Sequence, residues 1–238
     1  MSAVAWWYEN GIWKQGAAED VLGGRVISVV GGGGKTSLMY YLAGVYQRAG
    51  KRTAVLTSTR IFDPGDACRT VEDCRRRWRL GQYAVCGEKA ERGKLVIPNR
   101  ELLSALDTCA DVMLIEADGA KCKPCKAPAP HEPVLLEQSE TVIGVMGLDA
   151  LDRPVGEMCF RVEQVCELLG CDERHILTED DMAAILLSPR GTRKDVGARR
   201  YDVVLNKCDD PERLERGKSI AQKLRALGQE RTVLTKLK

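Results

Sequence analysis

A run of four glycines, Gly31–Gly34, is followed at once by Lys35, Thr36 and Ser37. An apolar, mostly β-branched run at 26–30 precedes the glycines, and a helical pattern follows them. Glycines let successive backbone N–H groups turn toward one point, because no Cβ stands in the way. A helix that begins near Lys35 would direct its unpaired N–H groups and its positive dipole end to the same point. The stretch therefore predicts a loop for the phosphates of a nucleoside triphosphate.

The residues after the glycines have specific tasks in such a loop. The Lys35 ammonium is a mobile cation for the terminal phosphates, and the Thr36 hydroxyl is placed to ligate Mg²⁺. The standard pattern G-x-x-x-x-G-K-[ST] would need a glycine where Val29 stands. The shorter G-x-x-G-K-T found here is similar to the loop of the Mur-type amide ligases, and the alternative is a glycine-rich turn without a ligand. The candidate nucleotide-binding residues of this stretch are Gly31, Gly32, Gly33, Gly34, Lys35, Thr36 and Ser37.

A second motif follows the apolar strand pattern at 201–205. Asn206, Lys207 and Asp209 fit N-K-x-D, the guanine-reading motif of GTP-binding proteins. The Asp209 carboxylate can accept from N1–H and the exocyclic amine of guanine, groups that adenine does not offer in that arrangement. A strand end in an open α/β sheet is where such a loop is expected. The alternative is a polar turn in which Asp209 caps a helix that begins at Pro211.

Two carboxylates lie at the end of the apolar strand pattern at 111–116. A carboxylate in this position, beside a phosphate-binding loop, can hold Mg²⁺, and strand alternation puts Glu116 and Asp118 on the same side. Either could do this. We assign the metal to Asp118 with Thr36, while Glu116 orients an attacking water or a substrate hydroxyl beside Lys35. The alternative is that both carboxylates are turn or helix-cap residues.

The proline-rich loop at 119–133 supplies further polar residues. Lys121, Lys126 and Glu132 are candidate substrate-binding residues, with Lys121 and Lys126 as the cations for an anionic group. A histidine pKa near neutrality suits His131 as a general base or a substrate ligand. With Lys35, Glu116 and Asp118, His131 completes the candidate catalytic set.

Alternating strand and helix patterns must position these groups. They predict a doubly wound, mostly parallel α/β sheet of the P-loop NTPase type, with helices on both faces. We predict a single domain over 1–238, with 1–23 as an N-terminal β arm. Short apolar pieces at 83–86 and 95–97 predict a hairpin pair near the sheet edge. The other predicted strands are at 26–30, 53–58, 111–116, 141–146, 201–205 and 232–234, and the longer helices at 37–49, 101–108, 160–170, 179–187 and 211–227.

Composition narrows the class of partner. The 36 basic and 34 acidic residues leave a formal net charge of +2, which argues against nucleic-acid and membrane-surface binding. No apolar run has the length of a membrane span, and the N-terminus lacks the pattern of a signal peptide. We therefore expect a cytoplasmic protein whose ten cysteines are reduced. The Cys122–Cys125 pair lacks the second half of a structural zinc site.

Taken together, the motifs resemble those of the YqeC-type accessory proteins of selenium-dependent molybdenum hydroxylases. The most diagnostic part is EADGAK at 116–121 followed by KAPAPHEPV at 126–134, while the C-x-x-C pair and the region 152–165 depart from the family pattern. The other matching stretches are 26–43, 53–64, 142–151 and 201–209. The resemblance implies a nucleotide-dependent step in the maturation of such a hydroxylase or of its cofactor.

Three functional hypotheses follow. The first is a Mg²⁺-dependent NTPase or phosphotransferase that acts on an anionic small molecule or cofactor, with GTP slightly favoured over ATP by the N-K-x-D motif. The second is a nucleotide-dependent switch that docks on a hydroxylase apoprotein or on a cofactor-synthesis partner. The third, an ATP-dependent Mur-like ligase, follows only from the short glycine loop.

Overall fold

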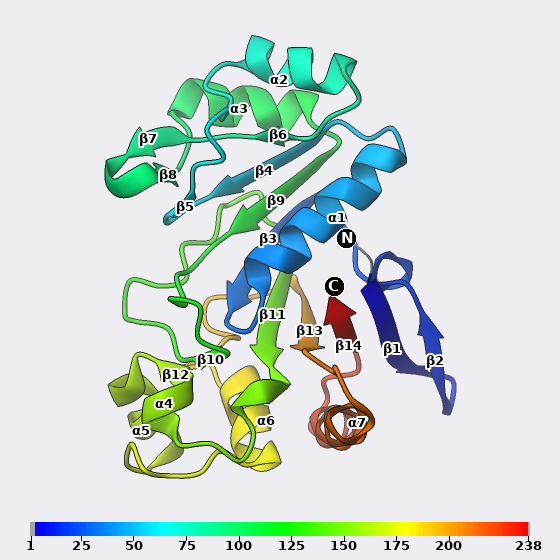
Figure 1. Cartoon of the computed structure of the whole chain (residues 1–238), viewed down its shortest axis with the longest axis vertical. Helices are drawn as coiled ribbons and strands as arrows, with labels where there is room; N and C mark the ends of the chain where they lie inside the picture. Colours follow the sequence, from blue (N-terminus) through cyan, green and yellow to red (C-terminus); the bar gives the residue numbers. More distant parts are fainter. Residues whose placement is uncertain (1–2, 238) are drawn as a thin grey trace.

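The computed structural model describes residues 3–237, and a nine-stranded sheet forms its centre (Figure 1). Within these residues seven neighbouring strands run parallel, and a hairpin of the first two strands adds antiparallel to one edge. The α/β class and the mostly parallel sheet are confirmed. The spatial order is β2 (Ile12–Gly16), β1 (Ala3–Glu9), β14 (Thr232–Leu237), β13 (Arg200–Asn206), β11 (Thr141–Gly147), β3 (Val26–Gly31), β9 (Val112–Glu116), β4 (Thr53–Thr57) and β6 (Ala84–Val85).

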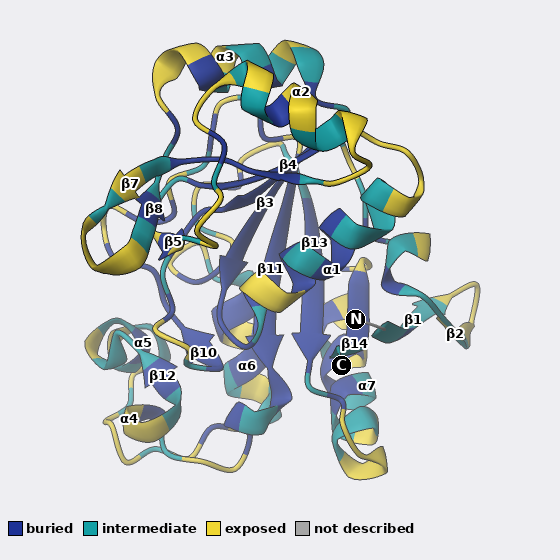
Figure 2. Ribbon diagram, turned by 45° about the horizontal axis from the view of Figure 1, so that its top comes forward, coloured by how far each residue is buried: buried dark blue, intermediate teal, exposed yellow. Residues whose placement is uncertain are grey.

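Helices cover both faces of this sheet. α1 (Lys35–Arg48) lies on one face, where Leu38 and Leu42 pack in one apolar cluster with Ile27 and Leu114. The next residues along the same strands, such as Met113, point to the opposite face, because side chains alternate along a strand. Figure 2 shows the strands buried between helices whose outer sides are exposed. The helices of the second face are α2 (Val71–Arg79), α3 (Arg100–Cys109), α6 (Glu179–Leu187) and α7 (Pro211–Ala226).

Two small sheets lie beside the main one, and they correct one prediction. The hairpin expected between 83–86 and 95–97 is wrong, because β6 joins the main sheet next to β4. The partner of β8 is instead β7, across a tight turn in which Arg92 and Gly93 adopt positive φ. Bringing two strands together through so short a loop has a low cost in chain entropy. The small sheets consist of β5 (Ile61–Phe62), β8 (Lys94–Val96) and β7 (Glu88–Ala90), and of β10 (Cys125–Lys126) and β12 (Cys159–Phe160).

The remaining elements are short. The loop expected at 119–133 is irregular apart from β10, which pairs in parallel with β12. α4 (Val155–Met158), β12 and α5 (Val162–Leu169) form a small lobe, residues 155–169, below the carboxyl end of the sheet in Figure 1. Single 3₁₀ turns occur at Ala18–Asp20, Glu91–Gly93 and Leu148–Ala150.

The topology brings the predicted motifs to one edge of the sheet. β3 is flanked by β9 on one side and by β11 on the other, so the chain crosses β3 between these two strands. The carboxyl ends of β3, β9 and β13 therefore lie along the same edge, together with the glycines, the two carboxylates and the N-K-x-D motif. Ligands of open α/β sheets bind at such a crossover point.

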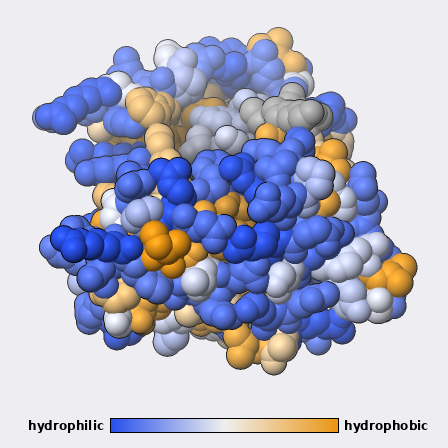
Figure 3. All heavy atoms as spheres, turned by 60° about the horizontal axis from the view of Figure 1, so that its bottom comes forward, coloured by the Kyte–Doolittle hydropathy of each residue, from blue (hydrophilic) through white to orange (hydrophobic). Residues whose placement is uncertain are grey.

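Among residues 3–237, every helix is too short or too polar to cross a membrane. Figure 3 shows one face of the molecule, on which hydrophobic residues form small separate groups among hydrophilic ones.

Candidate functional site

The glycine loop is tied tightly to the strands around it. The Gly31 N–H donates to the Asp118 carboxylate, at 3.0 Å from Oδ2 and 3.2 Å from Oδ1. The N–H groups of Gly32 and Gly33 donate to the carbonyls of Val145 and Lys123 over 2.9 and 3.0 Å. The N–H groups of the first three glycines thus have acceptors within the protein, and they are not the free phosphate donors that the sequence suggested.

Glycine is required in this loop for two physical reasons. Gly34 has φ +120°, a conformation that strains any other residue, and a Cβ there would lie 2.4 Å from Asn206 Nδ2. Gly33 has φ +75°, and a Cβ there would lie 2.1 Å from the Gly147 nitrogen. The loop packs backbone against backbone between β11 and the end of β13.

Free donors are found one step further along the chain. Among the described residues the structure gives no hydrogen-bond acceptor for the N–H groups of 34–37, where α1 begins. These groups lie at the positive end of the helix dipole, an arrangement that favours an anion. The first turn of α1 therefore supplies the donors that were expected from the glycines.

Lys35 lies in the middle of this cluster. Its side chain is buried, and its Nζ donates to the Gly31 carbonyl over 2.7 Å. The same nitrogen is 3.2 Å from Asp118 Oδ1 and 3.9 Å from Glu116 Oε1. The ammonium is thus held between the loop and both predicted carboxylates.

The structure separates the roles of the two carboxylates. Thr36 Oγ1 donates to Glu116 Oε2 over 2.8 Å, so the predicted metal-ligating hydroxyl lies beside Glu116. Burial raises the pKa of the Glu116 carboxyl, although the Lys35 charge and the Thr36 hydrogen bond act in the opposite direction. Asp118, which the sequence favoured as the metal ligand, has both oxygens bound by protein donors. The Thr36 hydroxyl and the Glu116 carboxylate are oxygen groups of the kind that could hold Mg²⁺.

The predicted substrate residues of the 119–133 loop divide into two groups. Lys126 is fully buried, and its Nζ lies 3.0 Å from Asp118 Oδ2 and 2.7 Å from Glu132 Oε2. Lys126 and Glu132 therefore face each other inside the protein. Lys121 and His131 are exposed, and Lys121 Nζ lies 5.2 Å from the centre of the Phe160 ring. Among the described residues no hydrogen bond joins His131 to the glycine loop.

Arg161 is a member of the cluster that the sequence did not identify. Its guanidinium donates from Nε and from a terminal nitrogen to the two oxygens of Glu132, over 3.0 and 2.9 Å. Burial acts to raise the pKa of Glu132, but the hydrogen bonds from Arg161 and Lys126 outweigh it and lower the pKa to about 2. Glu132 is therefore a fixed anion between two cations.

The N-K-x-D segment lies beside the glycine loop. Asn206 Nδ2 donates to the Gly33 carbonyl over 2.8 Å, and its Oδ1 accepts from the Thr235 hydroxyl over 2.9 Å. Lys207, with φ +66°, forms an ion pair with Asp149 in the 3₁₀ turn that follows β11. Thr235 and Asp149 are further contacts that the motif alone did not reveal.

Asp209 does not cap the helix that begins at Pro211. The N-cap of α7 is Asp210, whose side chain accepts from the Arg213 N–H over 2.8 Å. The Asp209 carboxylate is about half exposed, and its ion-pair partner is Arg213 at 3.8 Å. The helix-cap interpretation of Asp209 is therefore wrong, and its carboxylate remains accessible.

The described residues contain no group of three or more His, Cys, Asp or Glu side chains arranged to hold a metal ion. Cys122 is exposed and Cys125 is buried, so the two thiols of the C-x-x-C pair lie in different environments. A site at Thr36 and Glu116 would thus depend on the phosphates and on water for its remaining ligands.

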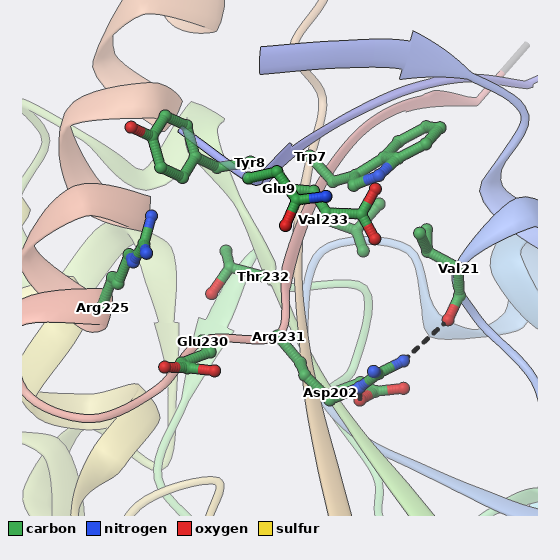
Figure 4. Close-up of a pocket in the computed structure, with 11 residues that line it drawn as sticks. Trp7, Tyr8, Glu9, Val21, Asp202, Arg225, Glu230, Arg231, Thr232 and Val233 are labelled. Carbon is green, nitrogen blue, oxygen red and sulfur yellow. Dashed lines mark hydrogen bonds and ion pairs between the residues drawn. The ribbon is translucent and has the colours of Figure 1, made fainter. Parts of the chain in front are cut away.

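A hollow of about 270 Å³ lies at the opposite end of the strands from the glycine loop, near the amino ends of β13 and β14 (Figure 4). Its lining includes Asp202 and Thr232, which lie near the amino ends of β13 and β14, and no residue of the glycine loop. Arg231, in its wall, already pairs with Asp202 and donates to the Val21 carbonyl. Because it lies at the amino ends of the strands, this hollow is separate from the candidate site.

Comparison with known proteins agrees with the sequence resemblance. Residues 27–163 match the family model described as YqeC protein. An uncharacterized protein YqeC of Escherichia coli (strain K12) is 34% identical over 195 residues, which covers 74% of this chain and 73% of that protein. The matched family range includes the glycine loop, both carboxylates and the 119–133 loop, whereas Asn206–Asp209 lies beyond it. The chain belongs to the YqeC family.

Proposed function

We propose that this protein is a magnesium-dependent P-loop NTPase or phosphotransferase that binds a nucleoside triphosphate at the start of α1. One observation carries the proposal: the N–H groups of 34–37, which have no acceptor among residues 3–237, lie beside the Lys35 ammonium and the Thr36–Glu116 oxygen pair. Phosphoryl transfer needs chiefly positioning and charge stabilisation, and these groups supply both.

The roles follow from the contacts of each side chain. Lys35 and the free N–H groups bind the phosphates, with Gly31–Gly34 as the turn that presents them. Thr36 and Glu116 hold Mg²⁺, which neutralises phosphate charge when it is bound. Asp118 orients Lys35 through their 3.2 Å ion pair. In this proposal the metal-ligand role moves from Asp118 to Glu116.

The base is proposed to be guanine. Asn206 is held by the glycine loop and by Thr235, and the Asp209 carboxylate two residues beyond Lys207 is accessible. This arrangement supports a base site beside the phosphate site. It also disfavours the ATP-dependent ligase, since an accessible carboxylate at this point selects the two donors of guanine.

The binding test compares two lysines. We expect calorimetry with Mg²⁺ to show GTP binding by the unaltered protein and binding at least about tenfold weaker in Lys35→Ala, which loses charge-assisted contacts to the phosphates. Lys51→Ala is the matched control, because Lys51 is an exposed residue just beyond the far end of α1. Equal affinity in Lys35→Ala and the unaltered protein would remove the proposed site.

The base test compares two neighbouring aspartates. Asp209→Ala is expected to lose about tenfold to a hundredfold of GTP affinity while its ATP affinity stays constant, because hydrogen bonds to a charged acceptor are lost. Asp210→Ala should keep the preference and lose about 1 kcal/mol of unfolding free energy, because it removes the cap of α7. Competition binding of GTP against ATP checks the first result, and urea unfolding checks the second.

The biological setting is proposed from the resemblance to the accessory proteins of selenium-dependent molybdenum hydroxylases. There the nucleotide step would serve maturation of the hydroxylase or of its cofactor, with an anionic molecule as the second substrate. The exposed Lys121 is the residue of the 119–133 loop that is best placed to meet such an anion. The nucleotide-dependent switch is the second candidate, and a buried chain of charges beside Lys35 favours it.

A further inference from the structure

An unbroken series of ion pairs leads away from the glycine loop. Lys35 contacts Asp118 at 3.2 Å, and Asp118 contacts Lys126 at 3.0 Å. Lys126 contacts Glu132 at 2.7 Å, and Glu132 contacts Arg161 at 2.9 Å. We call these five residues the ion chain. Arg161 is the N-cap residue of α5, so the chain ends in the lobe at 155–169.

The side chains of the ion chain are mostly buried, so the position of each one depends on the others. The side chains of Lys35, Asp118, Lys126 and Glu132 are 0–7% exposed, and only that of Arg161 reaches 25%. With Glu116 included, three cations balance three anions. Because buried charges are poorly screened, each side chain keeps its position only while its neighbours keep theirs.

We propose that Glu132 and Arg161 are positioning residues of the nucleotide site, which hold Lys126 against Asp118 and thereby couple occupancy of the glycine loop to the position of the 155–169 lobe. This inference rests on the proposed function. It assigns Lys126 and Glu132 a role different from substrate binding, and it gives Arg161 a role that nothing in the sequence motifs supplied.

The coupling follows from charge balance. A triphosphate draws the Lys35 ammonium toward its terminal phosphates, and Asp118 then keeps only the Gly31 N–H and Lys126 as partners. Lys126 shifts toward Asp118, and its hold on Glu132 loosens. Glu132 then keeps the Ala129 N–H and the two hydrogen bonds from Arg161, and the Arg161 backbone begins α5. The lobe moves with it, and by thermodynamic reciprocity anything that holds the lobe also changes nucleotide affinity.

The first experiment measures affinity for GTP with Mg²⁺ by calorimetry. Arg161→Gln should weaken binding about tenfold, and Arg161→Lys, which keeps the charge but not the two-pronged contact, should weaken it less. Arg153→Gln is the matched control, because Arg153 lies next to the lobe and its ion-pair partner within residues 3–237 is Glu157, outside the ion chain. Circular dichroism of each variant checks that it is folded.

A double-mutant cycle then tests transmission. Asp118 and Arg161 do not touch, and two more side chains separate them, so independent effects would add. We expect the double variant Asp118→Asn/Arg161→Gln to bind GTP about as weakly as the weaker single variant. Additive losses would overturn the ion chain as a connected unit.

Amide hydrogen exchange separates coupling from a purely structural role of the ion chain, because a structural role predicts no nucleotide-dependent change in the lobe. A non-hydrolysable GTP analogue at saturating concentration should change exchange in 155–169 of the unaltered protein, and this change should be absent from Asp118→Asn. An unchanged response in Asp118→Asn, or GTP affinity in Arg161→Gln equal to that of the unaltered protein, removes the positioning role alone. Absence of GTP binding by the unaltered protein removes both this inference and the proposed function.

Discussion

Two glutamates close to the glycine loop have their pKa values moved in opposite directions. Burial raises the pKa of Glu116, whose nearest donor is the Thr36 hydroxyl. Burial acts on Glu132 in the same direction, but Arg161 and Lys126 lower its pKa to about 2. The same residue type thus has its neutral form favoured in one place and its anionic form favoured in the other.

The low pKa of Glu132 predicts a stability effect with a defined pH window. A folded-state pKa of about 2 against an ordinary value of 4.5 means that Glu132 stabilises the fold fully above pH 4.5. That contribution is lost as pH falls from 4.5 toward 2. Glu132→Gln should therefore lower the free energy of unfolding by about 3–5 kcal/mol at neutral pH, since it removes the carboxylate charge that Lys126 and Arg161 share.

Urea unfolding over this pH range measures the difference between Glu132→Gln and the unaltered protein. The difference should shrink as pH falls below 4.5. Glu137→Gln is the control, because Glu137 is exposed in the following segment. A difference that stays constant across the window would contradict the assigned charge of Glu132.

At the scale of elements, the loop between β3 and α1 is fixed by close backbone contacts. Gly34→Ala should lower the free energy of unfolding by about 1–3 kcal/mol, because it forces a side chain into φ +120° and against Asn206. It should also weaken GTP binding, since Asn206 would be displaced. Gly119→Ala is the control, because a Cβ at Gly119 meets nothing within 4 Å. Equal stability of the two variants would contradict the close packing of the loop.

Most elements could be predicted because their signals are local. The apolar run at 112–116 indicates a strand buried on both faces, and Pro211 marks the start of α7. The partners of short strands could not be predicted, because β6 pairs with a strand about thirty residues earlier in the chain. Choosing between Asp209 and Asp210 as the cap also required the backbone, since both precede Pro211.

The part of the candidate site that belongs to sequence motifs could be predicted, and the rest could not. Lys35, Thr36 and Glu116 come together because strand ends in a parallel sheet share one edge. Arg161 had no such signal, because its contact with Glu132 spans 29 residues and joins a loop to a helix start. The inward direction of Lys126 was also unforeseen, since lysines are rarely buried.

For the molecule as a whole, the N-terminal hairpin closes one edge of the sheet. β1 pairs with β14 from Ala3 to Trp7, and β2 then forms the outer strand. Without the hairpin, β14 would present unpaired N–H and C=O groups, which is a template for association with other chains. The hairpin lies on the far side of β13 and β14 from the glycine loop.

Deletion of residues 3–16 should therefore separate stability from binding. We expect Tm to fall by several degrees, since each kcal/mol lost corresponds to about 2–4 °C in a chain of this size. Self-association should increase in size-exclusion chromatography, whereas GTP affinity of the folded fraction should stay unchanged. A shortened protein that remains monomeric and equally stable would show that β14 does not need to pair with β1.

The two hydrogen bonds of the Asn206 amide have a consequence for how specificity can change. One bond holds the glycine turn and the other holds Thr235. Under the proposed function, the base site and the phosphate site would therefore both depend on this one side chain. If the protein binds GTP as proposed, a substitution at Asn206 would weaken the binding of every nucleotide, whatever its base. Under the same proposal, a substitution at Asp209 would change the base preference and leave the glycine turn in place, because the ion-pair partner of Asp209 is Arg213 of the following helix.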